Sequence, residues 1–252
     1  MRTSDDTFTM ERRRLLVAGG SILAGAVFLS ARQADAAASA GQKRSKPAAA
    51  KKDAGQGEED VSPAEDLMRE HGVLNRILLI YDESVRRLDA GAADVPSDVI
   101  TGAADIVRRF IEDYYEKLEE THLFPRFERA KTLTDLVATL RAQHQAGRRV
   151  TDLVTQLATA QNIKNAGERP KLIAAIRQFN RMYRPHEARE DTVLFPAFRK
   201  IVSKNEYASL GEDFEKQEHK LFGEDGFESM VDKVAGLEKR LGIYDLGQFT
   251  PR

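Results

Sequence analysis

The chain contains no cysteine and no tryptophan, and only five of its 252 residues are histidine. Without cysteine it can form no disulfide, thiolate zinc site, cysteine-ligated iron–sulfur cluster or cysteine nucleophile. It also lacks an excess of either charge, because 39 Lys and Arg are balanced by 40 Asp and Glu. This balance removes the main electrostatic argument for a nucleic-acid partner. Any metal or acid–base chemistry must therefore use imidazole, carboxylate, phenol or hydroxyl groups.

Residues 1–36 have the pattern of an export signal. The basic run Arg12–Arg14 precedes the modestly apolar stretch Leu15–Ser30, and small residues at Ala34 and Ala36 have the spacing of a cleavage site. The apolar stretch is shorter than the roughly 20 residues that a membrane span needs. The arginine pair resembles a twin-arginine signal, although a glutamate precedes it, and this route is favoured over general secretion or an uncleaved anchor. We expect an exported, periplasmic protein with no stable membrane span after cleavage.

Composition divides the rest of the chain into three parts. Residues 37–61 are rich in Ala, Lys, Gly, Gln and Glu and contain almost no large apolar side chain. Such a segment cannot bury enough surface to offset its ordering entropy, so it is predicted to be a disordered linker. We expect a helical domain at 62–200, followed by a C-terminal helical extension and tail at 201–252.

Helix signals dominate from the start of this domain. Ser62–Glu65 is a capping box with proline at the first helical position, and Thr132–Asp135 and Ser203–Glu206 have related patterns. Apolar residues recur at steps of three and four, as in amphipathic helices, and no strand-like alternation interrupts them. The sequence therefore predicts an all-α fold, an antiparallel up-down-up-down four-helix bundle. Further helices are expected at about 204–222 and 226–240.

Polar residues interrupt the apolar seams at one height. His71, Glu119, His144, His186 and Glu190 occupy inward positions, and all are expected roughly 12 to 20 Å from one end of the bundle at a rise of 1.5 Å per residue. The spacing of four between His186 and Glu190 puts both on one helix face. Burying such groups unpaired costs several kcal/mol, and bound metal ions relieve that cost. The pattern indicates a metal site of iron or manganese type in the bundle core.

Several motifs in this layer resemble those of the hemerythrin-like, or HHE cation-binding, family over about residues 63–200. The matching pieces are Arg69-Glu70-His71, Gln143-His144, His186 to Glu190, and the two Leu-Phe-Pro tails at 123–125 and 194–196. The resemblance implies a non-haem di-iron centre, with manganese or a mixed pair of metals as the alternative. It also implies that Glu119 and Glu190 are the bridging carboxylates.

One position departs from the family pattern. Tyr115 stands where the second helix of the family usually carries a histidine. After it come Glu116, Glu119 and His122, which are three residues apart from one another. Tyr115 is predicted to be either a ligand or a hydrogen-bonding neighbour of the ligands. His219 is expected at a surface or interface on the fifth helix. The full set of predicted metal ligands is His71, Glu116, Glu119, His122, His144, His186 and Glu190.

The oxygen-rich ligand set favours the higher oxidation state of iron. The resemblance therefore implies a protein that binds or senses O₂, peroxide or NO, or that holds iron, rather than a simple reversible O₂ carrier. A di-iron oxidase or peroxidase using the same centre is one alternative. A metal-poor helical module that binds a partner through its C-terminal helices is another. Glu70, Glu120 and Glu187 are expected to be solvated.

Overall fold

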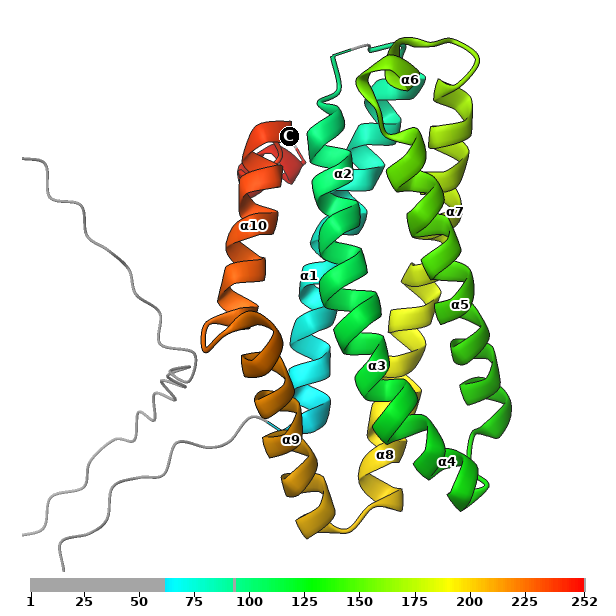
Figure 1. Cartoon of the computed structure of the whole chain (residues 1–252), viewed down its shortest axis with the longest axis vertical. Helices are drawn as coiled ribbons and strands as arrows, with labels where there is room; N and C mark the ends of the chain where they lie inside the picture. The colour runs from blue at the N-terminus through cyan, green and yellow to red at the C-terminus, as the bar shows by residue number, and fades with distance from the viewer. Residues whose placement is uncertain (1–61, 93, 252) are drawn as a thin grey trace, which may run out of the picture. The chain divides into compact units, whose positions relative to one another are not determined.

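The computed structural model describes residues 62–92 and 94–251, and within these ranges the chain is helical and contains no strand (Figure 1). The predicted all-α fold is thereby confirmed. The predicted export signal at 1–36 and the predicted linker at 37–61 lie outside the described residues. No described helix is both long enough and apolar enough to cross a membrane.

Four long helices form the bundle, and two of them are continuous rods assembled from shorter pieces. The first rod is α1 (Pro63–Asp89), and the third is α5 (Thr134–Leu157). The second rod joins α2 (Ser97–Ile106), the π-helical η1 (Val107–Tyr115), α3 (Glu116–Leu118), the π-helical η2 (Glu119–Leu123) and α4 (Phe124–Ala130). The fourth rod joins α7 (Arg169–Arg189), the π-helical η3 (Glu190–Leu194) and α8 (Phe195–Ile201). The short helix α6 (Ala160–Lys164) lies in the connection between α5 and α7.

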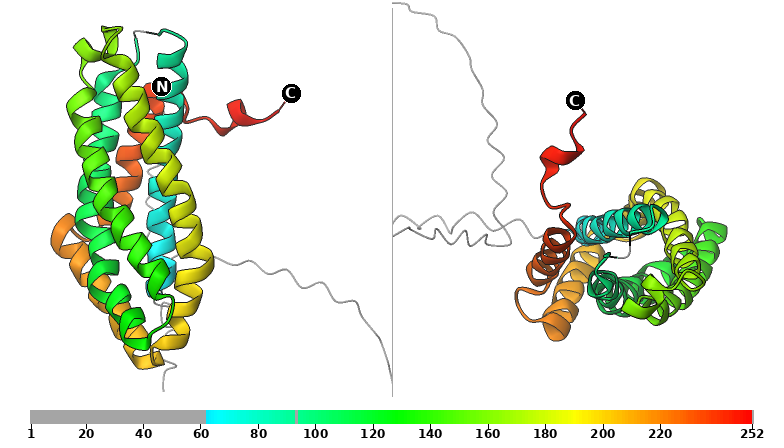
Figure 2. Two further views of the ribbon diagram at one scale, coloured as in Figure 1. Left: turned by 90° about the vertical axis from the view of Figure 1, so that its right-hand side faces the viewer. Right: turned by 90° about the horizontal axis from the view of Figure 1, so that it is seen from above.

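The C-terminal extension covers one side of this bundle. It consists of α9 (Lys204–Phe222), α10 (Gly226–Leu241) and the 3₁₀ turn η4 (Leu246–Phe249). Helix α10 packs against α1 and α2, and α9 packs against α1, as the end-on view shows (Figure 2). The extension therefore buries part of the outer face of α1, which would otherwise face solvent.

Two of the predicted helix starts are capped as expected. The Ser62 hydroxyl accepts a hydrogen bond from the backbone amide of Glu65 at 3.3 Å, and the Ser203 hydroxyl accepts one from the amide of Glu206 at 3.2 Å. Each bond satisfies an amide that has no partner inside the helix.

The predicted start at Thr132 differs from the structure. Helix α5 begins at Thr134, and no side chain caps it. The preceding Leu133 has φ of 51° and Lys131 has φ of 52°, so a tight left-handed reversal joins the two rods. The Thr132 hydroxyl donates back to the carbonyl of Ala130 instead of capping α5.

The two Leu-Phe-Pro tails account for the π-helical segments η2 and η3, but not for η1, which no proline follows closely. Pro125 and Pro196 each lack an amide hydrogen, and their rings clash with the carbonyl four residues earlier. The turn before each proline is widened, giving the π-helical segments η2 and η3. Glu119 is the first residue of η2 and Glu190 is the first residue of η3, so both carboxylates enter the core at equivalent points.

Candidate metal centre

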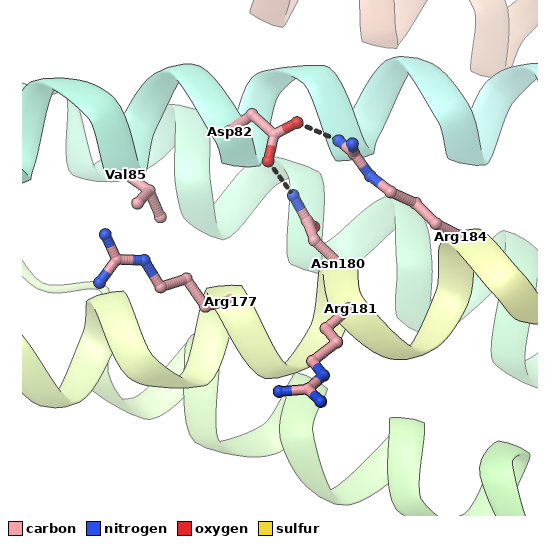
Figure 3. Close-up of a pocket in the computed structure, with 6 residues that line it drawn as sticks. All are labelled: Asp82, Val85, Arg177, Asn180, Arg181 and Arg184. Atoms are coloured by element: carbon pink, nitrogen blue, oxygen red, sulfur yellow. Dashed lines mark hydrogen bonds and ion pairs between the residues drawn. The ribbon is translucent and has the colours of Figure 1, made fainter.

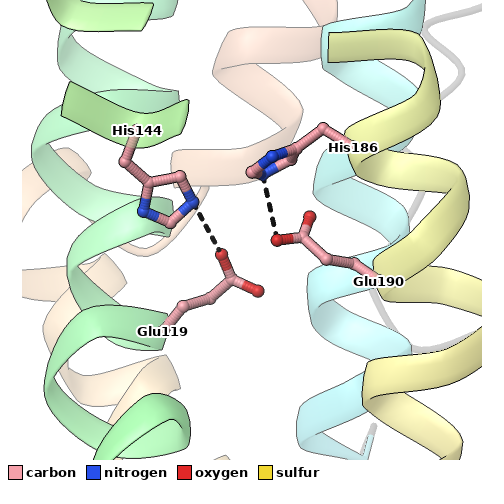
Figure 4. A group of neighbouring side chains, drawn as sticks. All are labelled: Glu119, His144, His186 and Glu190. Carbon is pink, nitrogen blue, oxygen red and sulfur yellow. Dashed lines mark ion pairs between the residues drawn. The ribbon is translucent and has the colours of Figure 1, made fainter. Parts of the chain in front are cut away.

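Four buried side chains meet between the second, third and fourth rods. Glu119, His144, His186 and Glu190 each offer a ligand atom, and these atoms all lie within 4.8 Å of one another (Figure 4). His144 Nε2 is 3.4 Å from Glu119 Oε2, and His186 Nε2 is 3.0 Å from Glu190 Oε1. The four are among the residues predicted from the inward layer.

His71 and Tyr115 extend this group toward α1. His71 Nε2 lies 3.2 Å from Glu190 Oε2 and 2.6 Å from the Tyr115 hydroxyl. The same hydroxyl donates to Glu190 Oε2 at 3.4 Å. Glu190 therefore presents one oxygen to His186 and the other to His71, as a carboxylate shared between two neighbouring positions would.

The outward nitrogen of each histidine is held by a polar side chain. The Nδ1 atoms bond to Asp191 Oδ1 at 2.7 Å from His71, to Glu120 Oε1 at 3.1 Å from His144 and to Gln143 Oε1 at 2.9 Å from His186. Such outer partners fix the orientation of an imidazole ring and direct its other nitrogen toward a metal. In all three cases Nε2 is the nitrogen left facing the core.

Several atoms at the centre have no hydrogen bond. Both oxygens of Glu119, Nε2 of His144 and Oε1 of Glu190 are buried and lack such a partner among the described residues. Leaving buried polar atoms in this state costs free energy unless another species satisfies them. Carboxylate oxygens together with imidazole nitrogens suit iron or manganese. The residues present therefore fit a metal ion of that kind.

Burial and neighbouring charge shift the pKa values of these groups in opposite directions. Burial, with the nearby charge of Glu190, raises the pKa of Glu119 to about 8. Burial raises the pKa of Glu190, but the positive charge of His186 and hydrogen bonds outweigh it, and the net pKa is lowered. Burial lowers the pKa of His144, yet the adjacent carboxylates of Glu119 and Glu120 raise it overall, to about 10. The metal-free site therefore holds protons that a metal ion must displace.

The whole domain matches one known family. The model of the hemerythrin HHE cation-binding domain matches residues 62–198 and, in a second overlapping match, residues 136–242. The chain belongs to the hemerythrin HHE cation-binding domain family. The first match agrees with the resemblance predicted over about 63–200, and the second extends the likeness into α9 and α10.

Three relatives are similar to this family member over most of its length. One uncharacterized protein from Mycobacterium bovis and two from strains of Mycobacterium tuberculosis are each 53% identical to it over 191 residues. The alignment covers 76% of this chain and 74% of each relative. No solved structure matches the chain.

Two predicted ligands of this family member lie apart from the four-residue group. Glu116 is fully buried, but it accepts a hydrogen bond from the Tyr183 hydroxyl at 2.8 Å and pairs with Arg148 at 2.7 Å. It lies 4.0 Å from Nδ1 of His144, which is the outward nitrogen of that ring.

His122, the other predicted ligand, points toward the C-terminal extension. It is partly exposed, its ring centroid is 5.5 Å from that of Phe214 on α9, and its Nε2 is 3.2 Å from Gln217 Nε2. The structure therefore places this imidazole in the contact between the second rod and α9. His219, also on α9, is partly exposed, in keeping with its expected place at a surface or interface.

Three glutamates expected to be solvated are buried or partly buried. Glu70 is 1% exposed and Glu187 is 3% exposed, and Glu187 accepts a hydrogen bond from Asn75 at 2.5 Å. Glu120 binds His144 and pairs with Arg148 at 2.9 Å. The expectation that these glutamates are solvated was wrong, because the helical pattern alone does not show which outer faces are covered by α9 and the neighbouring rods.

A separate surface pocket lies between α1 and α7 (Figure 3). Its volume is about 210 Å³, and arginines from α7 line it beside Asp82. Arg184 pairs with Asp82, which also accepts a hydrogen bond from Asn180 at 2.7 Å. Arg177 pairs with Asp89. Because two of its arginines already have carboxylate partners, this pocket is a weaker candidate than the buried centre.

Proposed function

We propose that this protein holds two iron ions in the bundle core. Either the ions bind or sense O₂, peroxide or NO, or the protein serves to hold the iron itself. The observation that carries the proposal is the buried histidine–glutamate group with unsatisfied atoms facing inward. Membership of the HHE cation-binding family supports it independently. Manganese, alone or with iron, fits the same ligand types.

The contacts divide the proposed ligands between two positions. Glu119, His144 and His186 would hold one ion, and His71, with Tyr115 beside it, would hold the other. Glu190 faces both positions, with Oε1 toward His186 and Oε2 toward His71. Iron held there would supply the chemistry that binds a small oxygen-containing ligand. All the other groups of the proposed site are side chains of this protein.

An aromatic ring packs against each of two histidines in the site. The Phe195 ring stacks on His71 with centroids 5.7 Å apart, and the Phe124 ring stacks on His144 at 5.4 Å. Both phenylalanines are fully buried and belong to the Leu-Phe-Pro tails. The tails therefore widen the helix at the glutamate and also place an apolar ring against a histidine. These rings pack against the two imidazoles and hold them in place.

Tyr115 favours one second candidate, a di-iron oxidase or peroxidase. Its buried hydroxyl contacts both His71 and Glu190, so it can hold or give a proton at the edge of the site. Burial, with the charge of Glu119, raises its pKa well above the ordinary value, so the phenol stays protonated. Steady consumption of a reductant by the iron-loaded protein under O₂ or peroxide would favour the enzyme, and stoichiometric, reversible binding would favour a binding protein or sensor.

Metal content is the first experiment. The full chain would be reconstituted with Fe²⁺ without oxygen, desalted and measured by mass spectrometry of the metals. We expect about two iron ions per chain. Each of His144→Ala and His186→Ala should lower that number, because each removes an imidazole that is proposed to bind the metal. His219→Ala, on α9, is the matched control and should retain both ions. Less than about half an iron or manganese ion per wild-type chain would exclude the proposal.

We also propose that residues 1–36 direct export by a twin-arginine route to the periplasm. The support is the sequence pattern alone, with paired arginines, a modestly apolar stretch and small residues at the cleavage spacing. A reporter that is active only after folded export would be fused to this segment. Replacing Arg12 and Arg13 together by lysine should abolish export, whereas replacing Lys51 and Lys52 by arginine, within the same fusion extended to residue 61, should not. Unchanged export of the double-lysine variant would contradict this route.

A further inference from the structure

We propose a second cation site, made only of carboxylate oxygens, between α1 and α9. It is formed by Asp66, Glu70 and Glu218, whose ligand oxygens lie within 4.8 Å of one another. Asp66 and Glu70 are four residues apart on α1 and therefore share one helix face, and Glu218 comes from the neighbouring helix α9. None of the three belongs to the histidine–glutamate centre.

Burial of Glu70 is the observation that points to a ligand. The residue is 1% exposed, both of its carboxylate oxygens are buried, and neither forms a hydrogen bond with a described residue. Glu218 is also 1% exposed. Burial penalises the ionised form of Glu70, and the nearby carboxylates of Asp66 and Glu218 add repulsion. A divalent cation offsets this repulsion and satisfies the oxygens of Glu70.

The joint between α9 and α10 holds Glu218 in position. Its Oε1 accepts a hydrogen bond of 2.6 Å from the backbone amide of Phe227, in the first turn of α10. A Cβ on Gly226 would lie 2.7 Å from the same oxygen, so the backbone approaches the carboxylate closely here. The ring of Phe227 in turn lies 4.5 Å from the guanidinium of Arg69 on α1. The carboxylate of Glu218 is therefore fixed at a point where three helices meet.

The ligand chemistry differs from that of the iron centre. Three carboxylates and no imidazole or sulfur donor select a hard divalent cation such as Ca²⁺ or Mg²⁺, with water completing the coordination sphere. A cation bound to Asp66, Glu70 and Glu218 would link α1 of the bundle to α9 of the extension. Its binding should therefore stabilise the docking of the C-terminal helices as well as satisfy buried charge.

Calcium binding to the iron-loaded full chain tests this site, because Ca²⁺ prefers oxygen ligands and does not compete for a histidine-rich centre. Titration calorimetry should show one Ca²⁺ per chain, and saturating Ca²⁺ should raise the melting temperature by roughly 5 °C or more. The variant Glu218→Gln keeps an oxygen for the Phe227 amide but removes the charge. It should bind Ca²⁺ at least about tenfold more weakly and lose the thermal shift.

Two further variants make the outcome decisive. Glu212→Gln makes the same substitution at an exposed position of the same helix, and it should behave like the wild type. Asp66→Asn tests the site from α1 and should weaken Ca²⁺ binding even if Glu218→Gln fails to fold. Iron content, measured on every variant, should stay at the wild-type value.

A wild-type chain that shows neither binding nor a thermal shift with Ca²⁺ or Mg²⁺ would overturn the site. So would equal Ca²⁺ affinity in Asp66→Asn, in Glu212→Gln and in the wild type. Absence of iron with retained Ca²⁺ binding would overturn the iron proposal alone.

Discussion

Replacing Gly147 by alanine should destabilise the protein, although alanine is normally the better helix residue. Gly147 lies inside α5, where an added Cβ would overlap the Tyr183 hydroxyl and lie 2.9 Å from its Cζ. Tyr183 is 1% exposed, and its hydroxyl donates a hydrogen bond to the buried Glu116. The side chain therefore cannot move aside without losing that hydrogen bond. The close approach of α5 to α7 thus requires glycine at this position.

The size of the effect follows from three contributions. Overpacking a filled core costs about 1 to 3 kcal/mol. Losing the hydrogen bond to a buried carboxylate costs about 1 to 3 kcal/mol more. Alanine returns about 0.5 to 1 kcal/mol through its helix preference. The net loss should be about 1 to 5 kcal/mol, which lowers the melting temperature of a domain of this size by roughly 2 to 20 °C.

Thermal and urea unfolding of Gly147→Ala would be compared with Gly236→Ala. A Cβ on Gly236, which lies inside α10, meets nothing within 4 Å, so that variant should be slightly stabilised. Adding Tyr183→Phe to Gly147→Ala removes the nearest clashing atom and should recover part of the loss. If Gly147→Ala is as stable as the wild type, the packing of Tyr183 between α5 and Glu116 is not as described.

Three further predictions concern the metal centre. Tyr115→His adds an imidazole beside His71 and should raise iron retention against a competing chelator; lower retention would contradict the assignment of a second metal position there. The pKa of His144 is raised to about 10 and that of Glu119 to about 8, so both hold protons at neutral pH and must lose them to bind metal. Metal affinity should therefore fall as the pH is lowered, by up to about tenfold per unit for each proton displaced, which chelator competition at several pH values measures. His122→Ala should leave metal content unchanged by mass spectrometry, because its ring contacts α9, and loss of an ion would return His122 to the ligand set.

Much of the fold and the site could be predicted because both depend on helical periodicity. Steps of three and four identify the inward face of each rod, and short connections fix the antiparallel order. Counting from one end of the bundle then places His71, His144 and His186 at one height with Glu119 and Glu190. The structure brings all five together with Tyr115.

The rest depends on contacts between distant parts of the chain. Glu70 looks like a surface residue on α1, but it is buried where α9 and the second rod pack against that helix. His122 follows the spacing of a ligand, but its direction is set by Phe214 on α9. The π-helical segments η2 and η3 carry a local signal in the prolines, yet the resulting rotation of Glu119 and Glu190 is visible only in three dimensions. Helical periodicity describes one helix at a time and does not show which other helices pack against its outer face.

The position of Glu190 between two histidines has a thermodynamic consequence. If two ions bind as proposed, one carboxylate that serves both makes their affinities interdependent, and the coupling free energy is the same whichever ion binds first. The first ion would fix the carboxylate and displace protons that the second would otherwise have to remove. Partly filled protein should then be scarce, with chains either empty or holding a pair. The centre would act as a single switch in response to iron supply rather than as two independent stores.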